Sequence, residues 1–328
     1  MNIFILTNNP KRASFRQRIG IYLDTLRANG LNCEVAKLPS GSLARRQLFK
    51  QTTKFDGIFI HRKGLNFLDA FFLSKYSKKI IYDFDDAIMY SDKIPERKSW
   101  SHFKPFTRSV KLADMVIAGN SYLAEHALRF NKNVVVLPTG LDVKAYKVQT
   151  NIQNDEKIRL VWIGSRSTLK YLAEIKPALE QIGSCFNNVI LRIICNDFFD
   201  LKNMEVEKLQ WSLEKQAVDL ATSHIGLAPL PDNRFTRGKC GFKILQYQAA
   251  SLPVIASPVG VNSEYVRQNV SGFLATSIQQ WTEKITQLIK NPQLRKQMGN
   301  EGLAQVQNFD TDIIGKKLLE MITKCLVD

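Results

Sequence analysis

Short apolar runs that end in glycine or a polar residue recur along this sequence, with helical patterns between them. Five runs lie in the first part, at 2–7, 57–61, 79–84, 115–119 and 133–138, and five follow at 158–164, 189–196, 225–230, 252–257 and 272–275. Strands that are buried on both faces of a parallel sheet have this composition. Because strand and helix alternate twice, we predict an α/β fold with two Rossmann-like parallel-sheet domains facing each other across a cleft.

The length of the chain also favours two domains. It has 328 residues, and single cores stop growing at roughly 250 to 300 residues. The segment 139–157 is polar and has almost no periodicity, so we place the linker there. We therefore expect an N-terminal domain over 1–143 and a C-terminal domain over 155–308. In open α/β sheets, ligands bind at the carboxyl ends of the strands.

The net charge of +16 is concentrated in the first part of the chain. Residues 1–137 carry 23 Lys and Arg against 11 Asp and Glu, whereas the remainder carries 23 against 19. Clustered cations favour an anionic partner, such as nucleic acid, a phosphorylated glycan or anionic lipid headgroups. The alternative is that the extra lysines only keep the protein soluble.

Cysteine and histidine usage indicates a reducing compartment and no metal site. The five cysteines include no C-x-x-C pair, and the four histidines have no metal-ligand spacing.

Targeting and membrane signals are weak in this sequence. It shows no signal-peptide pattern and no apolar run that reaches the length of a membrane span. We expect a cytoplasmic protein that is able to rest on the inner face of the cytoplasmic membrane.

The stretch 238–262 combines glycine and lysine just before an expected helix. If that helix begins at Gly241 or Phe242, its free N–H groups and its dipole favour an anion, and the glycines let the backbone approach closely. Lys239 and Lys243 would add positive charge, and the amide of Gln246 would bind a sugar hydroxyl. The expected nucleotide site also includes Gly238. The alternative is an ordinary glycine-containing connection with solvated lysines.

A second candidate for anion binding follows the strand at 158–164. The strand ends at Gly164, and Ser165, Arg166 and Lys170 follow at the next helix start. Arginine offers a planar fork for phosphate oxygens, and lysine offers a point charge. Two such loops in one domain predict a single diphosphate site.

Three carboxylates lie at the end of the strand at 79–84 in the first domain. Asp83 and Asp85 form a D-x-D pattern, and Asp86 comes next. At a strand end, these side chains could orient or deprotonate an acceptor hydroxyl, and burial beside other acids would raise their pKa values. A metal site and a structural cap remain as alternatives.

Several ordered motifs resemble glycosyltransferase family 4, whose members have the GT-B fold. They are "YDFDDAI", "ADMVIAGNSYLAEHA", "VLPTGLD", "WIGSRST" and the segment 226–307. The resemblance implies a nucleotide-sugar donor in the C-terminal domain, an acceptor in the N-terminal domain, and a final helix at about 311–328 that packs back on the first domain. It also implies transfer with retention at the anomeric carbon.

The chain departs from the family pattern at two acidic positions. The family commonly carries two glutamates separated by seven residues, and Gly238 and Gln246 occupy these positions here. We carry the nucleotide role over to Gln246, whose amide can bind ribose hydroxyls.

The family's glycine-rich first loop is replaced here by "NNPKRASFRQRIG". In this segment, Ser14, Arg16 and Arg18 suit a phosphate on either substrate. A basic surface helix start is the alternative.

These observations predict a glycosyltransferase that transfers a sugar from a nucleotide-sugar to a cell-envelope glycan or lipid-linked acceptor. Arg166, Lys243 and the helix start would stabilise the leaving diphosphate without a metal or other cofactor. Asp85 and Asp86 would act on the acceptor, with Asp83 and Asn120 beside it, although a helix cap at Ser121 would also explain "GNSYL". The alternatives are a noncatalytic nucleotide-sugar-binding protein, a sugar epimerase, and an anionic-polymer binding protein; no nucleic-acid motif is present.

Overall fold

The computed structural model describes residues 1–97, 99–148 and 157–328. Part of the predicted linker, and the predicted domain start at 155, lie outside the described residues. The chain divides into two compact units. The first comprises Met1–Gly140, Asn233–Cys240 and Phe309–Asp328, and the second comprises Leu141–Asp232 and Gly241–Asn308. The segment Asn233–Cys240, which we expected in the C-terminal domain, therefore belongs to the first unit.

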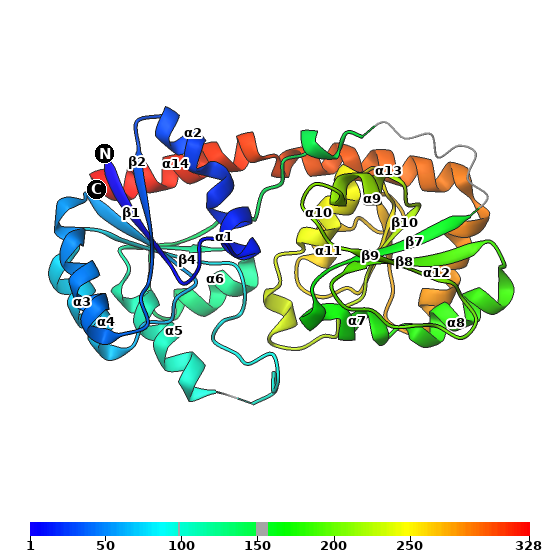
Figure 1. The fold of residues 1–328 in the computed structure, drawn as a ribbon, viewed down its shortest axis with the longest axis horizontal. Helices are drawn as coiled ribbons and strands as arrows, with labels where there is room; N and C mark the ends of the chain where they lie inside the picture. The colour runs from blue at the N-terminus through cyan, green and yellow to red at the C-terminus, as the bar shows by residue number, and fades with distance from the viewer. Residues whose placement is uncertain (98, 149–156) are drawn as a thin grey trace. The chain divides into compact units, whose positions relative to one another are not determined.

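The first unit contains a six-stranded parallel sheet in the order β2-β1-β3-β4-β5-β6 (Figure 1). Buried apolar side chains fill β1, β3, β4 and β5, which explains why these strands were evident in the sequence. The strands are β1 (Asn2–Thr7), β2 (Asn32–Lys37), β3 (Gly57–His61), β4 (Ile80–Phe84), β5 (Met115–Ala118) and β6 (Val134–Val136).

Helices cover both faces of this sheet. Figure 1 shows α2 and α14 on one side of it and α3, α4 and α5 on the other. Tyr22, Leu26, Ile314 and Leu318 belong to the core cluster of the first side. The helices of the unit are α1 (Ala13–Arg18), α2 (Leu23–Ala28), α3 (Ser42–Gln51), α4 (Phe67–Tyr76), α5 (Trp100–Leu112), α6 (Ser121–Leu128) and α14 (Thr311–Val327).

The second unit contains another six-stranded parallel sheet, in the order β12-β11-β10-β7-β8-β9. Counted within the unit from β9 to β12, this is the strand order 3-2-1-4-5-6 of dinucleotide-binding Rossmann folds. The strands are β7 (Ile158–Ile163), β8 (Val189–Cys195), β9 (Val206–Gln210), β10 (Ile225–Ala228), β11 (Val254–Ala256) and β12 (Gly272–Leu274).

The helices of the second unit pack in two groups. Apolar side chains of α7, α8 and α12 enclose one core cluster with the sheet, and α10 packs against α13. Glu174 and Ile175 separate α7 from α8, and Pro177 stands in the first turn of α8, where a missing N–H costs nothing. The helices are α7 (Leu169–Ala173), α8 (Lys176–Cys185), α9 (Gln216–Ala221), α10 (Phe242–Ala249), α11 (Asn262–Tyr265), α12 (Ile278–Lys290) and α13 (Pro292–Val306).

Polar side chains fix where several helices begin. Asn66 caps α4 by accepting the Asp69 N–H at 2.7 Å, and Asn120 caps α6 by accepting the Leu123 N–H at 2.9 Å. Such caps satisfy N–H groups that have no partner inside the helix. Across the described ranges, no helix combines the length and the apolar content needed to span a bilayer.

Candidate active site

Helix α10 of the second unit begins at a glycine in the left-handed region. Gly241 is the N-cap residue, with φ 64°, and no side chain of the described residues caps the helix. A Cβ atom at Gly241 would lie 2.8 Å from Val261 Cγ2 and 2.9 Å from the Tyr265 ring, so only glycine fits here. The first turn, which starts with Phe242 and Lys243, therefore presents its N–H groups and the positive end of the helix dipole.

Trp162 joins this helix start to the loop that follows β7. The Lys243 Nζ atom lies 4.4 Å from the centroid of the Trp162 ring, which is within the range of cation–π attraction. A Cβ atom at Gly164 would lie 2.4 Å from the same ring. Both predicted anion-binding segments of the second unit therefore contact one fully buried tryptophan.

The loop after β7 is a compact turn with two exposed cations. Ser165 and Thr168 form a capping box at the start of a short 3₁₀ helix. The side chain of Arg166 is 84% exposed, and its Nε atom lies 3.1 Å from Asp197 Oδ2. Lys170 is also exposed. Because an exposed ion pair contributes little to stability, Arg166 can exchange its carboxylate partner for an anionic ligand at low cost.

Gln246 lies inside the second unit in a network of polar side chains. Its Nε2 atom donates to Tyr146 Oη at 2.9 Å and to Gln216 Oε1 at 3.1 Å. Burial raises the pKa of Tyr146 to about 12, so its hydroxyl stays protonated at neutral pH. Both amide N–H atoms of Gln246 are thus used within the unit. The predicted contact with ribose would use the Oε1 atom of Gln246 or displace one of these partners.

In the first unit, Asp83 is the next-to-last residue of β4 and forms a buried ion pair. Arg18 Nε and Nη2 donate to Asp83 Oδ1 at 2.9 and 2.8 Å, and His61 Nδ1 lies 3.0 Å from Oδ2. Burial alone would raise the pKa of Asp83, but Arg18 and His61 outweigh it and hold the pKa below its ordinary value. The expected rise in pKa is therefore wrong for Asp83. Arg18 and Asp83 bind each other here, so direct contact with an acceptor stays a prediction for both.

Asp85 and Asp86 face Arg62, which follows β3. Arg62 Nε lies 3.2 Å from Asp85 Oδ1, and Lys239 Nζ lies 3.1 Å from Asp86 Oδ1. Arg62 Nη2 also donates to Asp86. Burial would raise the pKa of Asp86, yet Lys239 and Arg62 together lower it. The predicted rise is wrong for Asp86 as well, and a carboxylate with a lowered pKa is a weak base.

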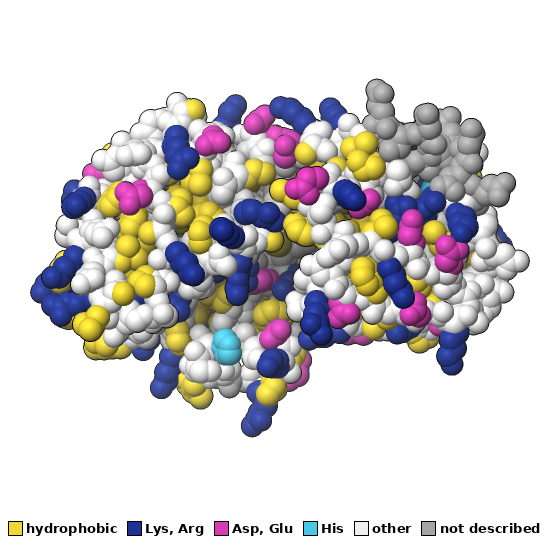
Figure 2. All heavy atoms as spheres, in the orientation of Figure 1, with side chains coloured by type: hydrophobic (Ala, Val, Ile, Leu, Met, Phe, Trp, Pro, Cys, Tyr) yellow, Lys and Arg dark blue, Asp and Glu magenta, His cyan; other side chains and the backbone are white. Residues whose placement is uncertain are grey.

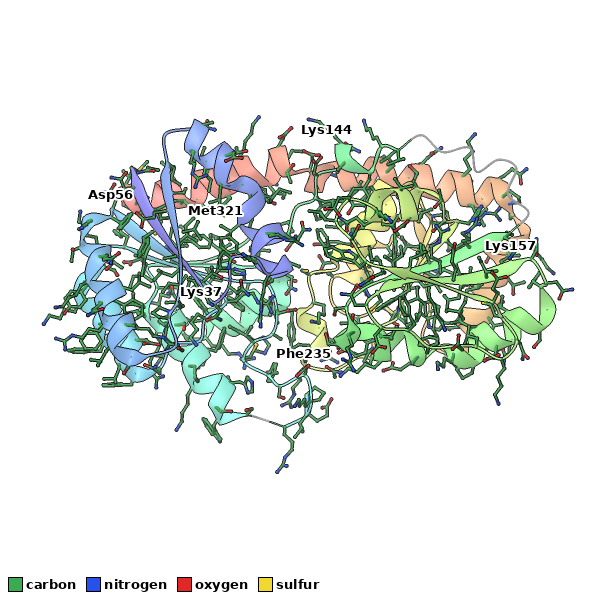
Figure 3. All side chains as sticks on the ribbon, viewed as in Figure 1. Lys37, Asp56, Lys144, Lys157, Phe235 and Met321 are labelled. Carbon is green, nitrogen blue, oxygen red and sulfur yellow. The ribbon has the colours of Figure 1, made fainter. Side chains whose placement is uncertain are left out.

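The segment Asn233–Cys240 brings Gly238 and Lys239 into the first unit. A Cβ atom at Gly238 would lie 2.7 Å from Ala87 Cβ and 2.9 Å from Leu123 Cδ2, so this position cannot hold the family's first glutamate in the observed packing. The Lys239 ammonium lies 4.5 Å from the ring centroid of Phe235, which Figure 3 labels. Lys239 was expected to add charge to the donor site; it is instead the counter-ion of Asp86, because their pairing offsets the burial of both charges.

The remaining predicted acceptor residues lie on α1 and at the start of α6. Asn120, and not Ser121, is the N-cap of α6, and its Nδ2 atom donates to the Lys239 carbonyl at 3.3 Å. Ser14 and Arg16 lie on α1 and are half-buried. Asn120 thus lies beside the carboxylate cluster of Asp85 and Asp86, to which Lys239 also belongs.

Sequence reasoning missed three residues of these sites: His61, Arg62 and Trp162. His61 ends the buried run of β3 and Arg62 follows it, just as Asp83 lies near the end of β4 and Asp85 follows it, and this pattern was the available signal. Arg62 adopts φ 53°, which is rare for a residue with a side chain. The Nε2 atom of His61 is buried and has no hydrogen-bond partner among the described residues.

A cavity of about 480 Å³ lies in the second unit at the carboxyl ends of β10, β11 and β12. Its lining comes from the segments after these strands, from Ile175 and Trp281, and from Glu174, whose pKa is raised by burial. These segments are Pro229–Asp232, Ser257–Val259 and Thr276–Ile278. This is the sheet edge at which open α/β folds bind their ligands.

The carboxylates of the D-x-D motif, Asp83 and Asp85, are paired with arginine side chains and, among the described residues, are not grouped as metal ligands. Asp83 and Asp85 each face an arginine. Within the described parts of the chain, no three His, Cys, Asp or Glu side chains are grouped so that they could hold a metal ion.

Part of this sequence matches a known protein family. Residues 144–305 match the family described as glycosyl transferases group 1. The matched region contains the α10 start and the loop after β7. No curated protein matches the sequence.

Solved structures share the fold at low sequence identity. Anabaena HepE in complex with UDP and glucose is 17% identical, with 99% of this chain and 100% of that chain covered and a TM-score of 0.74. Sucrose-phosphate synthase from Thermosynechococcus elongatus is 16% identical, with 99% of each chain covered and a TM-score of 0.76. WaaG, a glycosyltransferase involved in lipopolysaccharide biosynthesis, is 16% identical, with 98% and 100% covered and a TM-score of 0.72. The α/β fold is that of GT-B glycosyltransferases, as predicted.

Proposed function

We propose that this protein transfers a sugar from a nucleotide-sugar donor to an acceptor hydroxyl, with retention at the anomeric carbon. The observation that supports the proposal is the contact of both predicted anion-binding segments with Trp162, inside the region that matches the group 1 glycosyltransferases. The neighbour HepE binds UDP and glucose, which makes a UDP-sugar the first donor to test.

The donor diphosphate would bind at the start of α10. The N–H groups of its first turn and the Lys243 ammonium provide positive charge on one side, and Arg166 and Lys170 provide it from the loop after β7. A nucleoside diphosphate needs this combination of backbone donors and cations. We propose that these groups, without a metal ion or another cofactor, stabilise the leaving diphosphate.

The reaction follows from where charge develops. The bond between the anomeric carbon and the diphosphate oxygen breaks, and its electron pair leaves on the diphosphate. The acceptor oxygen forms the new bond to the anomeric carbon, and its proton passes to the departing diphosphate. The largest catalytic contribution is then stabilisation of negative charge by the α10 start, Lys243 and Arg166.

The first unit would supply the acceptor site. Asp85, Asp86 and Asn120 form a polar group that Arg62 and Lys239 fix in place. Because the pKa of Asp86 is lowered, we assign Asp86 to orienting the acceptor hydroxyl. The proposed acceptor is a cell-envelope glycan or a lipid-linked intermediate, reached from an anionic membrane surface on which the basic first unit rests.

A second function is favoured by one observation. Gly238 is packed against Ala87 and Leu123, with no room for the acidic side chain that the family carries there. If that acidic side chain is essential for transfer, the protein binds a nucleotide-sugar but does not transfer its sugar.

Thermal unfolding with UDP, GDP and ADP, each with and without a chelator, tests the donor site. A ligand at a hundred times its Kd adds roughly 2.7 kcal/mol of stability. Stabilisation by one nucleotide in the presence of chelator supports the proposed site, and no stabilisation by any nucleotide contradicts it. Release of the nucleoside diphosphate from its sugar donor, measured with envelope extracts as acceptor, then separates the transferase from the noncatalytic binder.

A further inference from the structure

The outer surface of α4 and α5 carries every aromatic side chain that is exposed in the described part of the chain. These side chains are Phe67, Phe71 and Trp100, with exposed fractions of 70%, 52% and 57%. Phe67 and Phe71 are four residues apart on α4, so they share one face of that helix. Leu68 on the same helix is also 52% exposed. Aromatic side chains cost free energy when they remain in water, which indicates that this surface has a partner.

Cationic side chains surround these aromatic residues. Trp100, Lys104, Arg108 and Lys111 follow one another along the outer side of α5 at helical spacing. The Lys104 ammonium lies 5.5 Å from the centroid of the Trp100 ring. Figure 2 shows further Lys and Arg side chains over α3 and α4, with hydrophobic side chains between them.

The surface is almost free of negative charge. Helices α3, α4 and α5 lie side by side and carry seven Lys and Arg residues but a single acid, Asp69. Asp69 is buried and bound to Arg45 at 2.8 Å. The face therefore has an uncompensated positive charge that complements an anionic surface.

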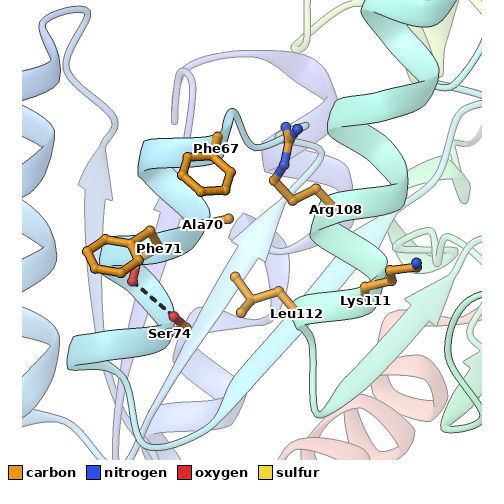
Figure 4. Close-up of a pocket in the computed structure, with 7 residues that line it drawn as sticks. All are labelled: Phe67, Ala70, Phe71, Ser74, Arg108, Lys111 and Leu112. Atoms are coloured by element: carbon orange, nitrogen blue, oxygen red, sulfur yellow. Dashed lines mark hydrogen bonds between the residues drawn. The ribbon is translucent and has the colours of Figure 1, made fainter.

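Two shallow hollows give the face its shape. One, of about 360 Å³, lies between α4 and α5, where Phe67 and Phe71 stand on one side and Arg108 and Lys111 on the other (Figure 4). The second, of about 330 Å³, runs along α5 beside Trp100 and shares Arg108 and Lys111 with the first. Each hollow thus joins an apolar wall to a cationic rim.

We propose that this surface, the α4–α5 face, docks on an anionic phospholipid bilayer. Phe67, Phe71 and Trp100 enter the boundary between headgroups and acyl chains, while Lys104, Arg108 and Lys111 bind lipid phosphates. This division between aromatic and basic side chains is what interfacial helices use. Aliphatic Leu68 beside the phenylalanines fits acyl chains better than nucleobases, which stack on planar groups. The inference deepens the membrane association proposed above and does not depend on the donor site.

Flotation of the full chain with vesicles tests the proposal. Vesicles of phosphatidylcholine alone are compared with vesicles that also contain phosphatidylglycerol, and binding is expected only to the second. Each basic residue near an anionic surface adds about 1 kcal/mol, so the double variant Lys104→Gln/Lys111→Gln is expected to lower the partition coefficient roughly 30-fold. The variant Phe71→Ser/Trp100→Ser is expected to lower it about tenfold.

Matched controls come from exposed residues of the second unit. Lys290→Gln/Lys296→Gln removes the same charge, and Leu213→Ser/Val218→Ser removes exposed apolar side chains; both are expected to bind vesicles as the unchanged chain does. Nucleotide binding by every variant serves as the test of folding and of the donor site. Loss of nucleotide binding with vesicle binding intact would count against the proposed function and not against the docking face.

Trp100 provides an independent measurement. It is the single exposed tryptophan of the four in the chain; Trp162 and Trp281 are buried and Trp211 is half-buried. Its emission should shift to the blue when anionic vesicles are added, and Trp100→Ser should abolish the shift. Glycerol phosphate should not reverse it, because a bilayer and not a single phosphate is bound.

Three results would overturn the inference. Equal binding to neutral and anionic vesicles would remove the role of charge. Full binding by the Phe71→Ser/Trp100→Ser variant would reduce the contact to adsorption of a basic surface without insertion. Self-association of the chain that this variant abolishes, without binding to vesicles, would assign the face to a second copy of the protein.

Discussion

The Lys243 ammonium lies 4.4 Å above the ring of Trp162 and is thereby held at the start of α10. Lys243 comes from the first turn of the helix, and Trp162 comes from β7, 81 positions earlier in the chain. The buried ring also touches the position of Gly164. A single apolar side chain thus fixes one cation of the proposed donor site relative to the loop that carries Arg166 and Lys170.

Removing the Lys243 cation should weaken binding of nucleoside diphosphates. A hydrogen bond to a charged group contributes about 1.5 to 3 kcal/mol, so Lys243→Ala should raise the Kd for UDP roughly tenfold to a hundredfold in titration calorimetry. The cation–π contact contributes only about 0.5 to 1 kcal/mol, so the midpoint of thermal unfolding should change little.

The control for this variant is Lys290→Ala, which removes an exposed lysine from α12 of the same unit. It should leave the Kd unchanged. Equal affinity of the Lys243→Ala protein and the unchanged chain would remove the anion site from the α10 start.

The glycine at the start of α10 should be irreplaceable for two separable reasons. Gly241 has φ 64°, and an added Cβ would meet Val261 and Tyr265 below 3 Å. Left-handed backbone costs about 1 to 2 kcal/mol for a residue with a Cβ atom, and overpacking adds about 1 to 3 kcal/mol. Gly241→Ala should therefore lower the urea midpoint of the second unit strongly.

Gly30→Ala isolates the backbone contribution to that loss. Gly30 has φ 82°, and an added Cβ there would meet nothing within 4 Å. The urea midpoint of the Gly30→Ala protein should therefore fall only by the cost of placing a residue with a Cβ atom in the left-handed region. If the two variants lose the same stability, the packing argument for Gly241 fails.

Interior strands were predictable from the sequence, whereas β2 and β9 were not. Both lie at sheet edges, and their side chains are largely exposed or half-buried. These two edge strands have one paired neighbour each and little cover, and they lack the continuous apolar run that identified β3 and β8 and also the edge strands β6 and β12. The criterion that found the core strands cannot find these two.

The partners of the predicted site residues could not be predicted either. The pKa of Asp83 is lowered by Arg18, 65 positions away, and by His61, 22 positions away. Their contact depends on which strands are neighbours. Likewise, Lys239 is 153 positions from Asp86. Spacing along the chain located the glycines and cations, but the charge balance at each carboxylate required the tertiary structure.

The buried pair of Asp83 and Arg18 should make stability depend on pH in a defined direction. The pKa of Asp83 is lowered in the folded state, so its stabilisation is complete above the unfolded-state pKa of about 3.9 and is lost as the pH falls through the folded-state pKa. At neutral pH, Asp83→Asn leaves the Arg18 charge uncompensated, which should cost roughly 3 to 5 kcal/mol.

Urea unfolding at several pH values measures this effect. The difference between the unchanged chain and Asp83→Asn should shrink below about pH 4. Asp24→Asn is the control, because the Asp24 side chain is fully exposed in its pair with Arg27; it should leave the midpoint unchanged. A difference that stays constant down to pH 3 would show that Asp83 does not act through its charge.

Restoring the family's acidic residue at Gly238 should loosen the protein instead of activating it. An added Cβ would lie 2.7 Å from Ala87 Cβ, so Gly238→Ala should destabilise the packing of Asn233–Cys240 by about 1 to 3 kcal/mol. Trypsin should then cleave after the exposed Arg234 and Arg237 roughly 5 to 150 times faster.

Gly238→Glu should accelerate cleavage more than Gly238→Ala does. Gly41→Ala, where an added Cβ meets nothing within 4 Å, should leave the cleavage rate unchanged. If Gly238→Glu instead raised sugar transfer without faster cleavage, the packing would not be the reason that this chain lacks the acid.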